Sequence, residues 1–213
     1  MHKFILPIIL GVLVLTRCNE SPKSKDKIVS LPRVKNTIQH NNTPKKVNPK
    51  NEVDTPMSDT VKSFLYWFKN NEKQLHQFTC INGGPFSTGT AKTSYYVDFN
   101  EVKKEVELLN NSNLFTEQFI QNYELRYKKG SEYFKKHPQF VGPPANFDYE
   151  YFFLTQDDYS PDLEAIEKIR FSTKIIDEHT AIVFFHLENC GMNLKHTLIK
   201  NTQWQIDKIE NDL

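Results

Sequence analysis

The chain has little of what marks several classes of protein. Only seven of its 213 residues are glycine, which excludes a collagen-like chain. Its formal net charge is only +1, which excludes a strongly basic nucleic-acid-binding protein unless the charge is unevenly distributed. Hydrophobic residues make up 38% of the chain and aromatic residues 13%, too large a share for a wholly disordered protein.

Long hydrophobic runs are also lacking, which excludes a polytopic membrane protein. The N-terminal run, residues 4–15, has twelve uncharged residues and follows the basic Lys3. As a helix it would be about 18 Å long, whereas the hydrocarbon core of a membrane is about 30 Å thick. The run is instead typical of a secretory signal peptide.

The apolar run ends in Leu15-Thr16-Arg17-Cys18, which resembles the lipobox of bacterial lipoproteins. In that motif a leucine stands three residues before a cysteine that is lipidated and becomes the new N-terminus. Leu15 and Thr16 match the motif, but Arg17 stands where a small residue is usual. The resemblance implies a signal peptide over residues 1–17 and lipid attachment at Cys18. An ordinary signal peptide or an uncleaved anchor is the alternative.

Charge is segregated behind this motif. Residues 19–57 carry a net charge of +4 and five prolines, whereas residues 58–213 carry −5. The first segment has few apolar residues, so it buries too little surface to offset its ordering entropy. We expect the lipidated cysteine and a disordered Lys/Pro-rich tether over residues 18–57, and one folded domain over residues 58–213. Attraction of the tether to anionic lipid head groups or cell-wall polymers is the alternative to a simple solvated linker.

Helical periodicity dominates the first part of the domain. Thr55-Pro56 is typical of a helix N-cap followed by proline at the first helical position. Apolar residues then recur at helical spacing: Val61, Phe64, Leu65 and Phe68. A second helix is predicted to begin after Asp98. A third is predicted to begin after Thr116 or Ser112 and to end at an irregular segment, residues 138–162.

The period then changes to that of a β-sheet. Mainly apolar and polar side chains alternate over residues 169–175 and 192–198, which predicts two strands, and a further strand is predicted at residues 204–207. Residues 181–187 are apolar on both faces, as in a central strand. The short turns between these segments indicate an antiparallel meander. We therefore predict an α+β fold with three N-terminal helices packed on an antiparallel sheet of about four strands.

Several segments are similar to a family of bacterial envelope lipoproteins of unknown function that have a nuclear-transport-factor-2-like, or cystatin-like, domain. They are residues 61–68, 95–106 and 156–157, and the closing strand at 204–209, where Trp204 precedes an Ile-Asp-x-Ile pattern. The resemblance implies a curved sheet with helices packed in its hollow, often leaving a cone-shaped pocket. It implies no activity, because this fold serves isomerases, dehydratases, binding proteins and scaffolds alike.

If Cys18 is lipidated, Cys80 and Cys190 remain as an even pair in an oxidising compartment. They form either a disulfide or two buried or free thiols, and we predict the disulfide. Each has a histidine four residues earlier, His76 and His186, a combination found in zinc sites. Residues four apart on a strand are separated by about 13 Å, so we expect no metal site, and no cofactor.

His196 shares a strand face with three apolar residues, Met192, Leu194 and Leu198. A histidine among such neighbours is usually a hydrogen-bonded core residue, but in a curved-sheet fold this face can line a pocket. Together with Tyr127, His196 is our candidate for a pocket residue that holds a polar ligand or does acid–base chemistry.

Motifs of catalysis are lacking. No serine stands in a Gly-x-Ser-x-Gly elbow. The glycine-rich turn at residues 82–85 lacks the Gly-Lys-Ser/Thr ending of a phosphate-binding loop. Asp157, Asp158 and Asp162 are interpreted as a solvated turn. We therefore predict no catalytic residue, and no nucleic-acid partner.

We expect a membrane-tethered lipoprotein of the cell envelope, facing the periplasm or the cell surface. Its domain should bind an unknown small ligand or an envelope protein without catalysis. One alternative is a small pocket enzyme of the isomerase or dehydratase type, which uses His196 with a tyrosine or an aspartate. The other is an assembly module that forms a homodimer through the open sheet face. Converging His, Tyr and Asp side chains in a pocket favour the enzyme, whereas a filled hollow with apolar residues on the outer sheet face favours the assembly module.

Lipidation at Cys18 is directly testable. Mass spectrometry of the native protein should show loss of residues 1–17 and a diacylglyceryl group on Cys18. Arg17→Gly should raise the processed fraction, because it restores a small residue before the cysteine. An intact Met1, or an N-terminus at another residue, contradicts this prediction.

Overall fold

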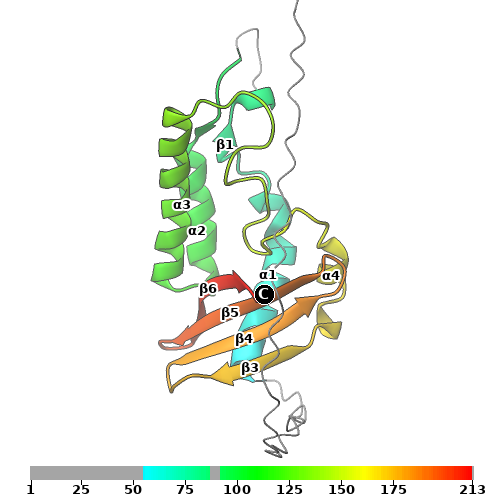
Figure 1. Cartoon of the computed structure of the whole chain (residues 1–213). Helices are drawn as coiled ribbons and strands as arrows, with labels where there is room; N and C mark the ends of the chain where they lie inside the picture. Colours follow the sequence, from blue (N-terminus) through cyan, green and yellow to red (C-terminus); the bar gives the residue numbers. More distant parts are fainter. Residues whose placement is uncertain (1–54, 87–91, 213) are drawn as a thin grey trace, which may run out of the picture. The chain divides into compact units, whose positions relative to one another are not determined.

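The structure is a computed structural model, and it describes residues 55–86 and 92–212. The predicted signal peptide, Cys18 and nearly all of the tether lie outside the described residues. In the described part, helices come first and a four-stranded antiparallel sheet closes the chain (Figure 1). The predicted α+β class is therefore confirmed.

The described part contains four α-helices and six strands in two sheets. The helices are α1 (Pro56–Leu75), α2 (Phe99–Ser112), α3 (Glu117–Lys136) and the short α4 (Ser160–Glu164). Two single-turn 3-10 helices span Gly84–Phe86 and Ile166–Lys168. The large sheet consists of β3 (Phe171–Ile175), β4 (Thr180–Leu187), β5 (Met192–Lys200) and β6 (Trp204–Asn211), and a small ribbon pairs β1 (Ile81–Asn82) with β2 (Tyr96–Val97). None of the described helices is long and apolar enough to cross a membrane.

The three long helices begin at the predicted caps. Thr55 accepts a hydrogen bond from the backbone N–H of Ser58, and the Ser58 hydroxyl accepts one from the N–H of Thr55. Asp98 and Thr116 likewise accept N–H groups in the first turns of α2 and α3. These bonds satisfy donors that have no partner inside a helix. Because α1 begins at Pro56, it starts two residues before the predicted domain boundary.

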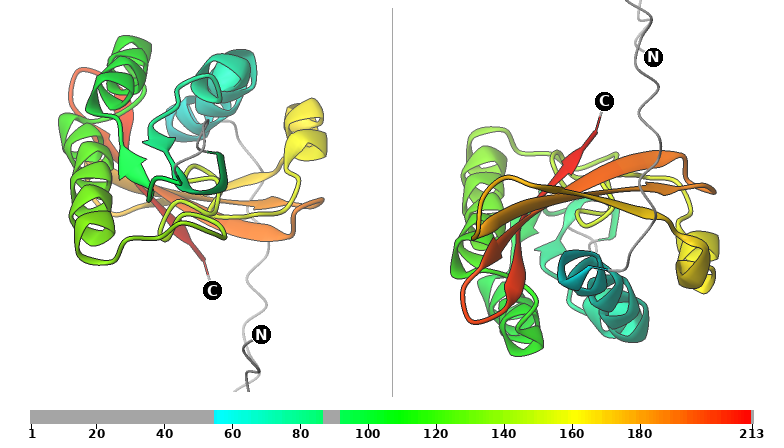
Figure 2. Two further views of the ribbon diagram at one scale, coloured as in Figure 1. Left: turned by 90° about the horizontal axis from the view of Figure 1, so that it is seen from above. Right: turned by 90° about the horizontal axis from the view of Figure 1, so that it is seen from below.

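The large sheet is an antiparallel meander in the order β3-β4-β5-β6, as predicted. Val183, His196 and Ile209 are paired across β4, β5 and β6, so their side chains point to the same face. Strand β4 has a neighbour on each side, as predicted for a central strand, but only one of its faces is fully buried. Its burial alternates, and Ile182 and Phe184 are only half-buried. The reason is that α1 packs along one face of the sheet, where it contacts β3, β4 and β6 (Figure 2).

Two elements lie in segments where the sequence predicted none. Strand β1 falls within the glycine-rich turn region, and α4 falls within the segment expected to be irregular. Strand β1 pairs only two residues with β2, and α4 has five residues. Elements this short show no full period of apolar residues, so periodicity does not reveal them.

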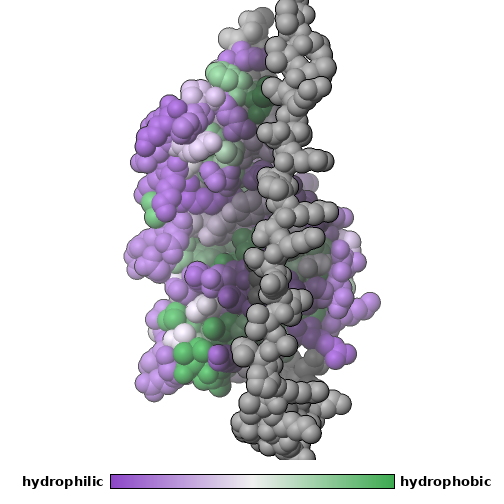
Figure 3. Space-filling model, in the orientation of Figure 1, coloured by the Kyte–Doolittle hydropathy of each residue, from purple (hydrophilic) through white to green (hydrophobic). Residues whose placement is uncertain are grey.

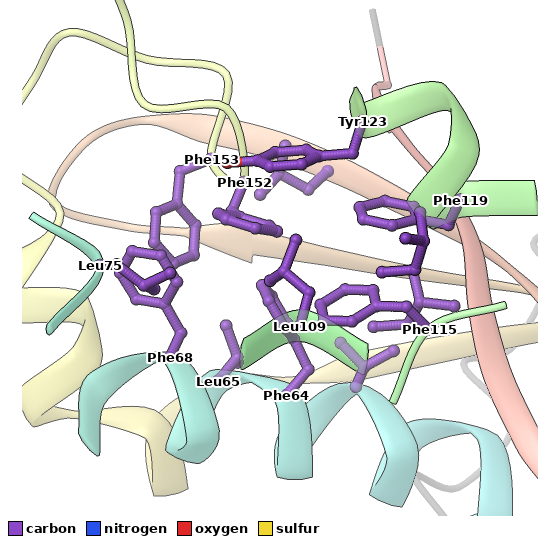
Figure 4. Close-up of a cluster of buried hydrophobic side chains, with 14 of the residues drawn as sticks. Phe64, Leu65, Phe68, Leu75, Leu109, Phe115, Phe119, Tyr123, Phe152 and Phe153 are labelled. Atoms are coloured by element: carbon purple, nitrogen blue, oxygen red, sulfur yellow. The ribbon is translucent and has the colours of Figure 1, made fainter. Parts of the chain in front are cut away.

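Aromatic rings fill the space between the helices and the large sheet (Figure 4). Phe68 of α1 lies 4.8 Å from Phe153 and 5.5 Å from Phe152, measured between ring centroids. Phe115 and Phe119 stack at 4.5 Å on the other side of the cluster. The hollow of the sheet is therefore occupied by side chains.

The long loop between α3 and α4 is anchored on α3. The ring of Phe147 approaches Gly130 so closely that a Cβ atom at this glycine would lie 2.3 Å from it. Phe147 also stacks on Tyr127, with 5.3 Å between ring centroids. This part of the loop thus packs against α3 at a place where only glycine leaves room.

Candidate functional site

A cavity of about 330 Å³ lies where the loop meets the helices. Its wall comes from the C-terminal end of α1 and the segment after it, from α2 and α3, and from the loop. Half of its lining residues are phenylalanines and tyrosines: Phe68, Phe78, Tyr123, Tyr127, Phe147, Tyr149, Tyr151 and Phe152. No residue of the large sheet lines it. Its volume is at the lower end of the range for small-molecule sites, about 300–1,000 Å³.

A carboxyl group, that of Glu105, lies in the buried part of the wall with only 7% of the residue exposed. It accepts hydrogen bonds from the hydroxyls of Tyr123 (2.9 Å) and Tyr127 (2.7 Å). The thiol of Cys80 donates a third bond, at 3.2 Å. The cluster therefore joins α2, α3 and the segment before β1.

Burial determines the protonation states in this cluster. It raises the pKa of Glu105, although the three donors act in the opposite direction. Burial also raises the pKa values of Tyr123, Tyr127 and Cys80, and the Glu105 carboxyl contributes to each increase. The tyrosines and the thiol therefore keep their protons at neutral pH. A protonated thiol is not a nucleophile, so the cluster offers fixed donors and an acceptor.

Arg126 of α3 lies among the rings of the same wall. Its guanidinium carbon is 4.5–5.7 Å from the centroids of four rings: Tyr127, Phe147, Tyr149 and Tyr151. Nη2 donates a hydrogen bond to the carbonyl of Asn146 at 3.3 Å. Nε is buried and has no hydrogen-bond partner among the described residues.

A second acid–base pair, His76 and Glu150, lies in the more exposed part of the wall. His76 Nε2 is 3.7 Å from Glu150 Oε2, and this carboxylate raises the pKa of His76. Glu150 Oε1 accepts the backbone N–H of Phe152 at 3.2 Å, which orients the carboxylate. The cavity thus has a buried cluster around Glu105 and a more accessible ion pair.

The structure separates the two predicted pocket residues. Tyr127 lines the cavity, but His196 does not. His196 has no exposed surface and packs edge-on against Phe64 (5.5 Å) and Phe185 (4.9 Å). Of the two sequence interpretations, the core position is the one found, but without the expected hydrogen bond: both ring nitrogens are buried and unpartnered among the described residues. Burial lowers the pKa of His196 to about 3.

The predicted disulfide is absent from the structure, where Cys80 and Cys190 are free, buried thiols. Cys80 bonds to Glu105, whereas the backbone N–H of Cys190 donates to Asp162. The interpretation of Asp162 as part of a solvated turn is also wrong. Only 3% exposed, it accepts two further bonds from Asn189 and so ties α4 to the turn between β4 and β5.

The histidine–cysteine spacings do not assemble a metal site in the described residues, where no group of three or more metal-binding side chains occurs. His76 and Cys80 line the same cavity, but their polar contacts are with Glu150 and Glu105. His186 Nδ1 is 2.9 Å from the side-chain oxygen of Asn193, its neighbour across the sheet.

Sequence reasoning missed Glu105 and Arg126. A signal for Glu105 exists: it follows Val102 by three residues and precedes Leu109 by four, so it lies on the apolar face of a helix. A carboxylate at such a position needs partners. Arg126 carries no comparable signal, because most of its ring partners come from the loop.

Comparisons with protein-family models, with curated proteins and with solved structures found no match to this chain.

Replacing His196 tests its role in the core. We expect His196→Leu to raise the free energy of unfolding at pH 7.5 by about 1–3 kcal/mol, because it removes buried polar atoms that have no partner. The difference in the free energy of unfolding between His196→Leu and the wild type should increase as the pH falls below about 6.5. There the unfolded chain binds a proton that the folded protein, with a His196 pKa of about 3, does not bind, so the wild type loses stability and the variant does not.

Urea denaturation at pH 7.5 and pH 5 measures this difference. His179→Leu, at an exposed turn, is the matched control and should show no such pH-dependent gain. A loss of stability in His196→Leu at pH 7.5 would show that the ring is hydrogen-bonded after all.

Proposed function

We propose that this protein is a membrane-tethered lipoprotein of the cell envelope whose α+β domain binds a small ligand in the cavity without catalysis. The N-terminal motif ending in Cys18 supports the anchor, and the net charge of +4 on residues 19–57 suits a solvated tether. The cavity beside Glu105 supports ligand binding, and it is the observation on which the proposal rests.

Two features favour binding over catalysis. The ionisable groups of the buried cluster are saturated by one another: Tyr123, Tyr127 and Cys80 all donate to Glu105. The enzyme alternative relied on His196, which has no exposed surface and lines no part of the cavity. A rigid polar cluster inside aromatic walls is typical of a site that orients a ligand.

We also propose a nuclear-transport-factor-2-like fold for the domain, with α1, α2 and α3 as the three N-terminal helices. The chain order supports it, since these helices precede an antiparallel meander. The cavity differs from the cone-shaped pocket of that resemblance, because aromatic rings fill the hollow and the cavity lies beyond it.

Blocking the cavity tests the binding function. Thr79 is exposed and lines the cavity, so Thr79→Trp should obstruct it without disturbing the core. In ligand-observed NMR with a library of small polar and aromatic compounds, we expect compounds that bind the full chain to bind Thr79→Trp at least tenfold more weakly. Thr202→Trp, at an exposed turn away from the cavity, is the control. Equal binding by both variants contradicts the proposal.

Assembly through the sheet is a second candidate, favoured by the filled hollow together with the outer sheet face. That face carries Ile182, Phe184 and Ile199, all half-buried. Ile176, directly after β3, is 49% exposed. Figure 3 shows hydrophobic side chains gathered over this part of the sheet. A second copy of the chain would bury them.

Sedimentation of the full chain tests this candidate. Under it the wild type sediments as a dimer, and Phe184→Glu sediments as a monomer because the new charge would be buried in the interface. Lys195 pairs with Phe184 across the sheet and can accommodate a carboxylate in the folded monomer. Phe140→Glu, on the exposed loop, should leave the dimer intact. A monomeric wild type removes this candidate.

A further inference from the structure

We propose that the ligand of the cavity is a neutral, hydroxyl-bearing ring, that is, a saccharide unit, rather than an organic ion. This inference rests on the proposed binding function and specifies the class of ligand.

The aromatic wall is already occupied by a cation. Rings around a cavity are typical of sites for organic cations, but here the Arg126 guanidinium lies within 4.5 Å of Phe147 and 4.8 Å of Tyr151. A second cation would meet a like charge at the place where the ring faces attract it. The internal arginine therefore disfavours a cationic ligand.

The charges of the wall also balance. Two acidic residues, Glu105 and Glu150, line the cavity together with two basic ones, Arg126 and His76. An anion attracted by Arg126 would approach carboxyl groups on two sides. A neutral ligand avoids both repulsions and the desolvation of its own charge.

Several polar atoms of the wall have bonding capacity left. Tyr149 and Tyr151 line the cavity, and a phenol hydroxyl can both donate and accept a hydrogen bond. Glu150 Oε2 is an acceptor whose nearest charged partner, His76, is 3.7 Å away. These groups call for a ligand that both donates and accepts, as hydroxyl groups do.

Ring geometry favours a saccharide over a flat heterocycle. Tyr151 is nearly perpendicular to its neighbours, at 75° to Tyr123 and 85° to Phe152. The nearly parallel pairs of the wall, Tyr123 with Phe152 (5.6 Å) and Tyr127 with Phe147 (5.3 Å), already pack on each other and leave no slot for a stacked base. The tyrosine hydroxyls of the wall instead suit the hydroxyls around a sugar ring.

The test is an NMR titration of the full chain with four probes: methyl β-D-glucopyranoside, N-acetyl-D-glucosamine, tetramethylammonium and benzoate. We expect at least one of the two sugars to bind, and Glu150→Gln to weaken this binding about tenfold, because the substitution removes the negative charge and one of the two acceptor oxygens. The Gln side-chain oxygen can still accept the Phe152 N–H, so the loop should keep its place. Glu164→Gln, at an exposed position of α4, is the matched control and should bind as the wild type does.

The outcomes separate the two proposals. If tetramethylammonium or benzoate binds and Thr79→Trp abolishes this binding, while neither sugar binds, the saccharide assignment is overturned and the binding function stands. If a sugar binds equally to wild type, Glu150→Gln and Thr79→Trp, it binds elsewhere and the assignment also fails. If no probe binds, the saccharide assignment fails, and the compound library described above decides the binding function separately.

Discussion

The contact between the loop rings Phe152 and Phe153 and the α1 rings Phe64 and Phe68 is the interaction on which the rest of the structure depends. The loop has little regular secondary structure, so few backbone hydrogen bonds hold it. Burial of these rings stabilises the loop in place of backbone hydrogen bonds, since each large aromatic side chain removes much apolar surface from water. The same contact closes the hollow over the sheet and positions the loop as one wall of the cavity.

The protein buries polar groups in two physically different ways. The Glu105 carboxyl is enclosed with three donors, so the loss of water is compensated and the geometry of α2 and α3 is specified. The His196 ring is enclosed by Phe64 and Phe185 with no partner for either nitrogen. Such a group opposes folding. Glu105 lines the cavity and His196 does not, so only Glu105 is placed to contribute to a binding site.

The cavity and the outer face of the large sheet lie in different parts of the domain. Because aromatic side chains fill the hollow, the sheet contributes no residue to the cavity wall. Its inner face stabilises the fold, and its outer face is available for another surface. Ligand binding and assembly are therefore compatible, since they use different parts of the domain. The more exposed pair His76 and Glu150 gives the cavity a polar approach from solvent.

Local pattern was enough to predict the class of the fold. The caps at Thr55, Asp98 and Thr116 and the alternation along β5 depend on neighbours within a few residues, so the sequence by itself determined where these helices begin and that the sheet is a meander. It also placed Tyr127 as a candidate site residue. Sequence analysis missed β1 and α4 because both elements are too short to show a full period of apolar residues.

Only the tertiary structure decided the chemistry. The Glu105 cluster joins residues 18, 22 and 25 positions apart, and the rings around Arg126 come from α3 and from a loop with no periodic signal. The sequence around His196 is compatible with three positions of its ring: hydrogen-bonded in the core, lining a pocket, or buried without a hydrogen-bond partner. Hydrogen bonds and ring contacts form between atoms a few ångströms apart in space, and for these groups that proximity is created by packing rather than by spacing along the chain.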